Sequence, residues 1–573
     1  MRIYKTNQND KSPGMSIFSG LYSLMLVIIL LAPVSVFSQW SDVPVSVAVN
    51  DQVNQVIVSD GSGGVIAAWQ DKRGGSTYDI YAQRLNSAGI VQWTTDGVTV
   101  CTADSSQINP RMVMDGSGGV IICWEDKRNP TGWDIYAQRL NSSGQPQWLN
   151  NGVAVATVVF DQDTIAMVSD GIGGAIMTWQ DYRSNNGFAD IYAQRVNNSG
   201  AMLWTANGVN ICNQAAAQRG PKLISDGTGG AFITWYDNRA GNYDIYTQRI
   251  STGGAVQWTT NGVATCTMAT DQLKPDICSD GASGVIITWY DYRSTTDFNI
   301  YAQRQGPAGA IVWTVDGVVM NNNVAYDQID PKIVSDGMGG GIISWTDYRT
   351  GITADIYAQR VNSTGAVQWT ATGVIICTSA GDQIKSQLVS DGTNGAYITW
   401  EDHRNAGNSD IYAQRIASNA AINWPATGFP ICTAQNNQVN PVIVVDGNLG
   451  AIVAWQDYRS GNNFDIYAAR FNTQSILGIG HNGTTASEFI LNQNYPNPFN
   501  PVTVIDYQLP KSSNVRIRIF DVLGKEVDAL VNEVQSAGVH NVTWNAANMP
   551  SGVYFYRIDA GSFSSIKKMV LIK

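Results

Sequence analysis

The stretch that decides the fold is Asp115-Gly116-Ser117-Gly118-Gly119-Val120-Ile121-Ile122-Cys123-Trp124-Glu125-Asp126-Lys127-Arg128, followed by Asp134-Ile135-Tyr136-Ala137-Gln138-Arg139. With few substitutions this pattern occurs eight times, at a step of 54 to 56 residues. Self-similarity at a fixed period indicates a repeat architecture, in which each copy is one structural unit. The first turn residues of the copies are Asp60, Asp115, Asp170, Asp226, Asp280, Asp336, Asp391 and Asp446.

One copy predicts four antiparallel strands. In the second copy, residues 111–114 form a short apolar run, and the glycine-rich turn after it is typical of a tight hairpin. Residues 120–124 are continuously apolar, which indicates a strand buried on both faces. Residues 135–140 predict a third strand. Residues 145–148, which carry a tryptophan, and 152–155 together predict the fourth.

Sheets that are buried on both faces must stack on neighbours, and a ring of sheets also protects their edges. The eighth copy stops after Asp465–Arg470 and has no fourth strand, whereas Gln39-Trp40 and Pro44–Ala48 supply such a strand at the other end of the chain. We therefore predict an all-β fold. It comprises an eight-bladed β-propeller over residues 39–472, whose N-terminal strand closes the last blade. Seven blades with one copy outside the ring is the alternative.

Residues that are present in every copy are interpreted as structural. In the first copy, Trp69 belongs to a buried strand, while Asp71 and Arg73 can close a loop by charge-assisted hydrogen bonds. Asp79 can cap the third strand, and Arg84 needs a carboxylate or carbonyl partner because its strand is enclosed. A cluster of arginines for acidic sugars and a ring of calcium sites are the alternatives for these residues.

Functional residues are expected where the copies differ. Antiparallel order places the loop between the second and third strands and the loop between blades on one face. Six copies have an aromatic residue there, suited to stacking on a sugar or peptide. His403 lies beside Glu401 on this face and is a candidate for acid–base work. Structural alternatives are that the aromatics wedge between blades and that His403 merely occupies a variable position. The aromatic candidates are Tyr78, Trp133, Phe188, Tyr243, Phe298 and Phe464.

The charge balance argues against nucleic acid as a partner. The chain has a formal net charge of −11, and residues 39–472 contain 24 basic and 38 acidic residues. A surface of this sign repels phosphate backbones. The chain has seven cysteines. Five of them occupy one position of the repeat, which suits buried small residues better than disulfides or metal ligands. We expect no metal and no cofactor.

The N-terminal segment predicts export. Arg2, Lys5 and Lys11 precede an apolar run from Leu21 to Val36, with small residues before Gln39. This pattern is typical of a secretory signal peptide over residues 1–38. A membrane anchor is the alternative, although the run is short for a bilayer span. We expect no transmembrane segment in the mature chain.

Composition changes after a polar linker at residues 473–488. Residues 489–573 contain several short alternating strands, which predict a small Ig-like β-sandwich. This region resembles the C-terminal sorting domain of the type IX secretion system and is similar to the Ig-like domain of flagellar hook-capping proteins. The residues that carry the resemblance are Tyr495, Pro496, Pro498, Phe499, Gly552, Tyr554, Lys567 and Lys568.

The resemblance implies export across the outer membrane by the type IX machinery and a location outside the cell or on its surface. We expect a monomeric binding or adhesion protein with an extracellular glycan or protein as its ligand. A glycan-processing hydrolase, like a sialidase propeller, and a passive surface-layer component are the alternatives. Near-identity of the copies weighs against an enzyme, because catalysis needs a few residues that are not repeated.

Overall fold

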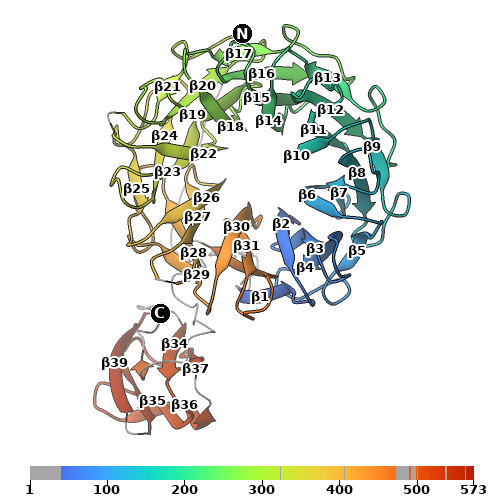
Figure 1. Cartoon of the computed structure of the whole chain (residues 1–573). Helices are drawn as coiled ribbons and strands as arrows, with labels where there is room; N and C mark the ends of the chain where they lie inside the picture. Colours follow the sequence, from blue (N-terminus) through green and yellow to red (C-terminus); the bar gives the residue numbers. More distant parts are fainter. Residues whose placement is uncertain are drawn as a thin grey trace, which may run out of the picture. The chain divides into compact units, whose positions relative to one another are not determined.

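The eight copies fold as eight four-stranded antiparallel sheets arranged in a ring (Figure 1). A computed structural model describes residues 40–322, 324–405, 407–472, 489–491, 494, 499, 501–535, 538–561 and 563–572. The predicted signal peptide and the linker at 473–488 lie outside these residues. Within them, no helix has the length and apolar character needed to cross a bilayer. The ring confirms the predicted eight-bladed propeller.

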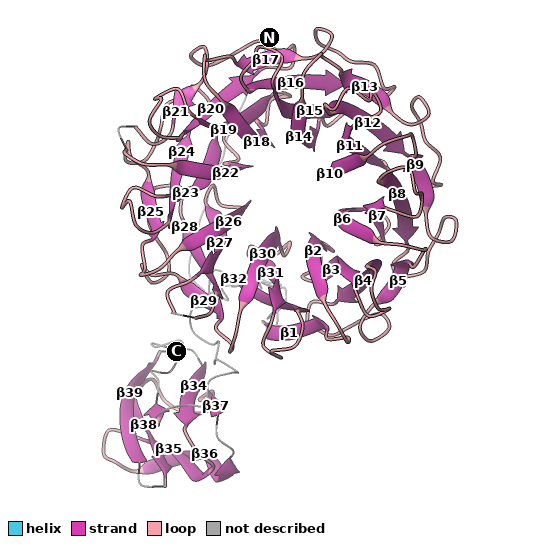
Figure 2. Cartoon of the chain, in the orientation of Figure 1, coloured by secondary structure: helices cyan, strands magenta, loops and turns pink. Residues whose placement is uncertain are grey.

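Seven blades place their strands in sequence order from the centre of the ring outward, and the last blade has β1 as its outermost strand (Figure 2). The innermost strands are β2 (Gln52–Ser59), β6 (Gln107–Met114), β10 (Gln162–Ser169), β14 (Gln218–Ser225), β18 (Gln272–Ser279), β22 (Gln328–Ser335), β26 (Gln383–Ser390) and β30 (Gln438–Val445). The second strands are β3 (Val65–Asp71), β7 (Val120–Asp126), β11 (Ala175–Asp181), β15 (Ala231–Asp237), β19 (Val285–Asp291), β23 (Gly341–Asp347), β27 (Ala396–Asp402) and β31 (Gly450–Asp457).

The outer half of each blade has one long and one short strand. The third strands are β4 (Asp79–Leu85), β8 (Asp134–Leu140), β12 (Asp190–Val196), β16 (Asp244–Ile250), β20 (Asn299–Gln305), β24 (Asp355–Val361), β28 (Asp410–Ile416) and β32 (Asp465–Asn472). The outermost strands are β5 (Val98–Cys101), β9 (Val153–Ala156), β13 (Val209–Cys212), β17 (Val263–Cys266), β21 (Val318–Val319), β25 (Val374–Cys377), β29 (Phe429–Cys432) and, in the last blade, β1 (Trp40–Ser46).

The hydrophobic core lies between the blades. It covers both faces of the second strand in each blade. All seven residues of β7 are buried, as its continuous apolar sequence predicts. The tryptophan of each second strand is fully buried, and in the first seven blades its ring packs against a glycine just before the outermost strand. A Cβ added to Gly97, which has a positive φ, would lie 2.7 Å from the ring of Trp69. Glycine is therefore required where the tryptophan packs.

The fourth strand differs from the prediction. Residues 145–148 do not join the sheet, apart from one bridge between Leu140 and Pro146, and only the following segment pairs as β9. Trp148 instead packs on the next blade, where its indole nitrogen donates to the carbonyl of Asn198 at 3.0 Å. The tryptophan leaves the sheet because its contacts are with a neighbouring blade.

The N-terminal strand closes the ring, as predicted. Strand β1 pairs antiparallel with β32, with Trp40 opposite Arg470 and Ser46 opposite Ile466. Further hydrogen bonds join the first and last blades, including Gln52 N to the carbonyl of Phe464 at 2.7 Å. Strand pairing between residues about 420 positions apart thus closes the ring without a covalent link, although joining such distant segments has an entropic cost.

The C-terminal region forms two sheets, ordered β33-β34-β37 and β36-β35-β38-β39. The core between them includes Tyr507, Trp544 and Tyr556, all almost fully buried. This arrangement agrees with the predicted sandwich. Its strands are β33 (Ile490–Leu491), β34 (Val502–Leu509), β35 (Ser513–Phe520), β36 (Glu526–Gln535), β37 (Gly538–Asn545), β38 (Gly552–Ala560) and β39 (Phe563–Leu571).

Replacing Trp40 by alanine should destabilise the propeller by about 3–5 kcal/mol, because the side chain is only 7% exposed and its loss leaves a cavity in the closing strand. Deleting residues 39–50 should have a larger effect, since it exposes the edge of β32. The measurement is the midpoint of chemical denaturation. Val47→Ala, at a half-exposed position just after β1, is the matched control. A deletion variant that unfolds at the wild-type midpoint would contradict the closure.

Candidate functional site

Each blade contains a cluster built from the repeated Trp-x-Asp-x-Arg sequence. In the first blade, the Asp71 carboxylate accepts hydrogen bonds from Trp69 Nε1 at 2.7 Å and from Arg73 Nη2 at 2.6 Å. Its other oxygen accepts from the backbone nitrogen and Nε of Arg73, at 2.8 and 2.9 Å. A fully buried carboxylate is tolerated here because every lone-pair direction meets a donor. We call these three residues and their equivalents the Trp-Asp-Arg cluster.

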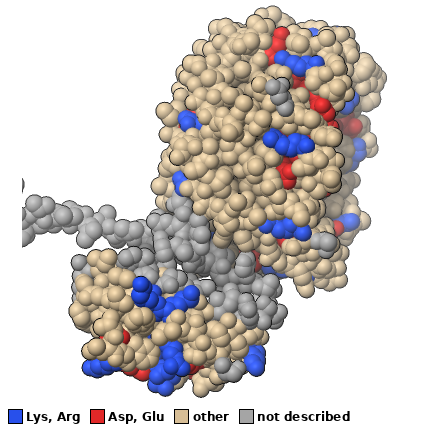
Figure 3. Space-filling view, turned by 90° about the vertical axis from the view of Figure 1, so that its left-hand side faces the viewer, with Lys and Arg blue, Asp and Glu red and all other residues tan. Residues whose placement is uncertain are grey.

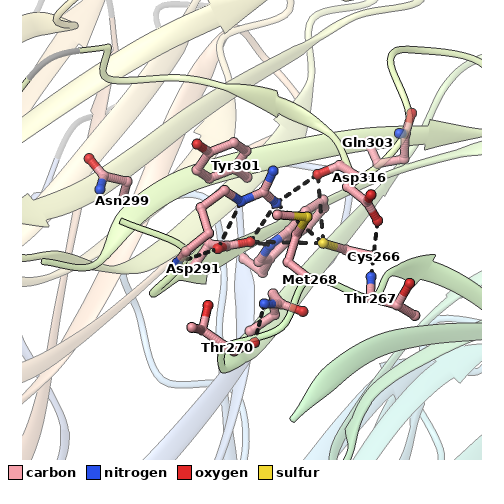
Figure 4. A network of polar contacts seen from close by, with 12 residues as sticks. Cys266, Thr267, Met268, Thr270, Asp291, Asn299, Tyr301, Gln303 and Asp316 are labelled. Atoms are coloured by element: carbon pink, nitrogen blue, oxygen red, sulfur yellow. Dashed lines mark hydrogen bonds and ion pairs between the residues drawn. The ribbon is translucent and has the colours of Figure 1, made fainter. Parts of the chain in front are cut away.

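The arginine of the cluster also joins neighbouring strands. In the fifth blade, Arg293 Nη2 donates to the carbonyl of Asp316 at 2.7 Å and to Cys266 Sγ at 3.3 Å, and its guanidinium lies 3.7 Å from the centre of the Tyr301 ring. Figure 4 shows Cys266, Asp291 and Asp316 converging on this point. Because Cys266 belongs to the outer strand of the fourth blade, the cluster connects successive blades as well as the strands of one blade.

The cysteines are structural in this arrangement. All seven are buried and carry free thiols, as expected. Burial raises the pKa of the Cys101 and Cys212 thiols to about 12, so neither is a reactive thiolate at neutral pH.

A second ion pair stabilises the opposite end of each blade. In the third blade, the Asp170 carboxylate accepts hydrogen bonds from the backbone nitrogens of Ile172 and Gly174 in its own turn. It also forms an ion pair with Arg195 at 2.9 Å. The same guanidinium donates to the carbonyl of Thr252 in the next blade at 2.9 Å. Arg84 pairs with Asp60 in the same way at 3.1 Å. The sixteen arginines that recur in every copy are therefore all bound to aspartates.

Asp79 and its equivalents are the least compensated carboxylates of the repeat. Asp79 opens β4 directly across from Asp71. Burial, followed by the charge of Asp71, raises its pKa to about 6, and Arg73 offsets part of that shift. Burial likewise raises the pKa to about 6 for Asp190, Asp244, Asp355, Asp410 and Asp465.

The two sets of loops do meet on one face. The backbone nitrogen of Gln107, after a loop between blades, donates to the carbonyl of Tyr78 at 2.7 Å. Tyr78 and Trp133 lie beneath the Nζ atoms of Lys72 and Lys127, at 5.6 and 5.3 Å from the ring centres. Phe188 is the most open of the six aromatic candidates, with 42% of its surface exposed. The other candidates, Tyr243, Phe298 and Phe464, pack on tyrosines of their own blade.

The structure brings Glu401 and His403 together. His403 Nε2 lies 3.2 Å from Glu401 Oε1, and the hydroxyl of Ser409 is close to the same ring. Glu401 is only 3% exposed, and its other oxygen accepts from the backbone nitrogen of Asn440 at 3.0 Å and from Lys385 Nζ at 3.1 Å. Glu401 therefore links two blades, and most of its hydrogen-bonding capacity is already in use.

Sequence reasoning predicted the innermost strands but missed the irregularity that each of them contains. In each of them the register shifts after the second residue, and the next residue has a positive φ of 46° to 58°. Such a bulge re-aims one side chain, and a left-handed conformation is costly for residues such as lysine or threonine. The bulge residues are Asn54, Asn109, Thr164, Gly220, Lys274, Asp330, Lys385 and Asn440.

The bulges are held by the preceding blade. The residue between tryptophan and aspartate reaches across, so that Gln70 Oε1 accepts from Asn109 N at 3.1 Å and Glu125 Oε1 accepts from Thr164 N at 2.8 Å. Burial raises the pKa of Glu125. Five of the eight bulge residues line a cavity at the centre of the ring, together with six of the residues two positions further along these strands.

Basic residues that are not repeated concentrate on these strands. Eight basic residues of 39–472 lie outside the repeat pattern. Six of the eight are on innermost strands, and the loop-face Lys72 and Lys127 are the others. On the side shown in Figure 3, the basic side chains of the propeller mostly lie beside acidic ones. An alignment of the eight copies with each other would have revealed this concentration. The six residues are Arg111, Arg219, Lys222, Lys274, Lys332 and Lys385.

Within the described residues, no group of three or more His, Cys, Asp or Glu side chains is placed to hold a metal ion.

In the C-terminal region, Phe499 is buried, and its backbone exchanges hydrogen bonds with β39, from Phe499 N to Val570 O at 2.9 Å and from Ile572 N to Phe499 O at 3.0 Å. Tyr554 is also buried, and its hydroxyl donates to the carbonyl of Pro550 at 2.8 Å. Gly552 opens β38, and Lys567 and Lys568 lie on β39. The remaining motif residues, Tyr495, Pro496 and Pro498, lie outside the described residues.

Residues 493–573 match the family model of the secretion system C-terminal sorting domain. The C-terminal domain is a type IX sorting domain. The chain is therefore a secreted or cell-surface β-propeller protein, and the sorting domain implies an interaction with the secretion machinery. A search of curated proteins found no match.

Several solved structures resemble the chain distantly. An endo-arabinase from Bacteroides thetaiotaomicron is 11% identical with a TM-score of 0.27, over 44% of this chain and 93% of that one. The polysaccharide lyase Uly1 is 9% identical with a TM-score of 0.40, over 67% and 93%. An alpha-L-arabinanase from Penicillium chrysogenum is 12% identical with a TM-score of 0.30, over 65% and 94%. None of these likenesses indicates what this chain binds.

Replacing Arg73 by alanine should lower the free energy of unfolding by about 3–5 kcal/mol, because the buried Asp71 carboxylate loses its charged partner. Phe188→Ala removes an exposed loop side chain and should change stability by less than about 0.5 kcal/mol. Chemical denaturation of both variants provides the comparison. Equal effects would contradict the division into structural clusters and loop residues.

Stability should fall as the pH rises from about 4 to about 6. The folded chain holds protons on Asp79 and its equivalents more tightly than the unfolded chain, whose aspartates titrate near 4. Their contribution is complete below that value and is lost as the pH passes the folded pKa of about 6.

Asp355→Asn should therefore raise the melting temperature, relative to wild type, more at pH 7 than at pH 4. Calorimetry at both pH values measures the difference. Asp104→Asn, at an exposed carboxylate between blades, is the control. An Asp355→Asn effect that is independent of pH would contradict the assignment.

Proposed function

We propose that this protein is a surface-displayed binding module, in which the sorting domain delivers a rigid propeller to the outside of the cell and the propeller grips an extracellular ligand. Cleavage of residues 1–38 as a signal peptide and a propeller domain spanning 39–472 are part of this proposal. The observation that carries it is the separation of roles within the repeat. The repeated arginines are bound to aspartates within the propeller. The residues that differ between copies lie instead on the loop face and along the channel at the centre of the ring, which is lined by the innermost strands.

This separation suits binding rather than chemistry. Repeated clusters make each blade rigid, and rigid scaffolds lose little entropy when loops or channel residues engage a ligand. Proteins commonly place their binding residues on loops, while the residues of the scaffold serve to pack the core. A ring of eight blades also offers one central site rather than eight weak ones.

A glycan hydrolase is the second candidate. The observation that favours it is that Glu125 and Asp163, on adjacent blades, both have raised pKa values, chiefly through burial, and that both accept hydrogen bonds from the bulge residue Thr164. Hydrolases of this kind need an acid with a raised pKa and a second carboxylate. Glu125 is, however, already bound by Asn109 Nδ2 at 2.8 Å and by the backbone of Thr164, which is the arrangement of a structural link.

The two functions are separated by incubating the purified full-length protein with a panel of extracellular polysaccharides. Binding is followed by surface plasmon resonance, and hydrolysis by the release of reducing ends. The binding function predicts retention of at least one glycan class without product. Product formation that Glu125→Gln abolishes would favour the hydrolase. An absence of both would leave a passive surface component.

The sorting domain should fail when its last strand is removed. Deleting residues 567–573 removes the buried Met569 and Leu571 and the pairing of β39 with Phe499, so the domain should unfold and the protein should accumulate in the periplasm. Cell fractionation and surface labelling provide the measurement. Leu523→Ser changes a side chain that is 89% exposed and should leave export unaffected. Normal surface levels of the truncated chain would refute the role of this strand.

A further inference from the structure

The centre of the propeller encloses a cavity of about 500 Å³, within the range of small-ligand sites. Its lining comes from the innermost strands of six blades and from β31. The side chains are polar amides and charged groups rather than aromatic residues. The lining is Asn54, Gln55, Val56, Asn109, Arg111, Lys222, Asp330, Lys332, Lys385, Ser386, Gln387, Asn440, Pro441, Val442 and Gln456.

Three basic side chains come from the same position of the repeat and so lie at one height along this channel. Two residues beyond the bulge, every second blade from the second to the sixth carries a basic residue, Arg111, Lys222 and Lys332. One carboxylate, Asp276, stands at the same level on the blade between the two lysines, and it already accepts a hydrogen bond from Ile333 N at 2.9 Å. The level therefore has more positive than negative charge, in a repeat region that is strongly acidic overall.

Among the basic residues that line the cavity, Lys222 has the fewest partners, since Arg111 and Lys332 donate to backbone carbonyls. Its side chain is exposed to the channel, and no hydrogen bond or ion pair joins it to another described residue. By contrast, Lys385 Nζ is held by Glu401 and Asn440, and Lys274 pairs with Asp330 at 3.1 Å. Enclosure by the channel walls lowers the pKa of Lys222; Asp276 opposes the shift, and Lys332 and Arg111 add to it. An incoming anion would relieve this loss of solvation and repulsion.

The opposite wall of the channel offers unused hydrogen-bonding atoms. Gln55 and Gln456 are each only 4% exposed, yet Gln55 Oε1 and Gln456 Nε2 have no hydrogen-bond partner among the described residues. Both residues line the cavity, on the first and last blades. Buried polar atoms without a partner cost free energy, so turning these two amides toward the cavity would let an acceptor and a donor on one wall bind a hydroxyl group, which both donates and accepts.

We propose that the channel binds an acidic carbohydrate, whose carboxylate lies against Lys222, Lys332 and Arg111 and whose hydroxyls meet Gln55 and Gln456. This assignment deepens the proposed binding function and depends on it. The amides of Asn54, Asn109 and Asn440 also line the cavity. An acidic peptide has the charge but few hydroxyls, and a nucleic acid would meet the acidic surface of the repeats.

The strained bulges support this assignment. Lys274, Lys385 and Thr164 adopt a left-handed backbone that such residues rarely adopt, and the bulge is repeated in every blade. Backbone strain retained at one position in all copies is typical of a position that must present a side chain. In five blades the bulge residue lies on the cavity wall, namely Asn54, Asn109, Asp330, Lys385 and Asn440.

The experiment is isothermal titration of the purified full-length protein with oligogalacturonate, with the uncharged galactose oligomer of equal length and with a glutamate oligomer. Wild type should bind oligogalacturonate most tightly, and the affinity should fall as salt is added. Lys222→Gln should weaken that binding about tenfold or more without changing the melting temperature. Asp276→Asn should strengthen it, because it removes the opposing charge. Lys72→Gln, which removes one positive charge from the loop face, is the matched control and should bind as wild type.

Equal binding by Lys222→Gln and wild type, or tighter binding of the glutamate oligomer, would overturn the channel assignment while leaving a binding function in place. Binding of neutral glycans alone would do the same. If wild type retains no glycan of any class, the proposed function itself fails. Should Lys222→Gln fold poorly, Lys332→Gln gives the same comparison from another blade.

Discussion

The structure depends on one buried carboxylate per blade. The aspartate of the Trp-Asp-Arg cluster accepts from an indole, from a guanidinium and from the backbone, so its charge is satisfied without water. The same guanidinium lies against a tyrosine ring and reaches the outer strand of the preceding blade. A single charged group therefore fixes the end of the second strand, the loop that follows and the junction between blades. Breaking it removes several contacts together, because none of the donors has another acceptor of equal strength.

This arrangement explains why repetition and function are separated. Every arginine that recurs has an aspartate partner, and the recurrent tryptophans fill the space between blades. The residues that differ between copies concentrate along the innermost strands and in the loops, outside the packed second strands. The bulge on each innermost strand re-aims one residue, and five of these residues line the cavity.

Closure of the ring and the chemistry of the channel are connected. Gln55 and Gln456 lie on the first and last blades, so the wall with unused hydrogen-bonding atoms exists only when β1 has completed the eighth sheet. The cations come from the second, fourth and sixth blades. The proposed site thus needs residues that are hundreds of positions apart in the chain, and it can form only in the closed propeller.

The number of blades, the place of closure and the route of export can all be read from the amino-acid sequence, because they follow from local patterns: a fixed period, a missing last strand and a recognisable C-terminal domain. The sequence also indicated that Asp71, Arg73 and Arg84 are structural. Only the tertiary structure decided that residues 145–148 leave the sheet, since Trp148 responds to contacts with the next blade. It also decided that Arg111, Lys222 and Lys332 share one level of a channel. Those residues are about 110 positions apart, and nothing in their local sequence distinguishes a channel-lining lysine from one on the outer surface. Register, bulges and ring closure set that proximity, and all three depend on long-range pairing.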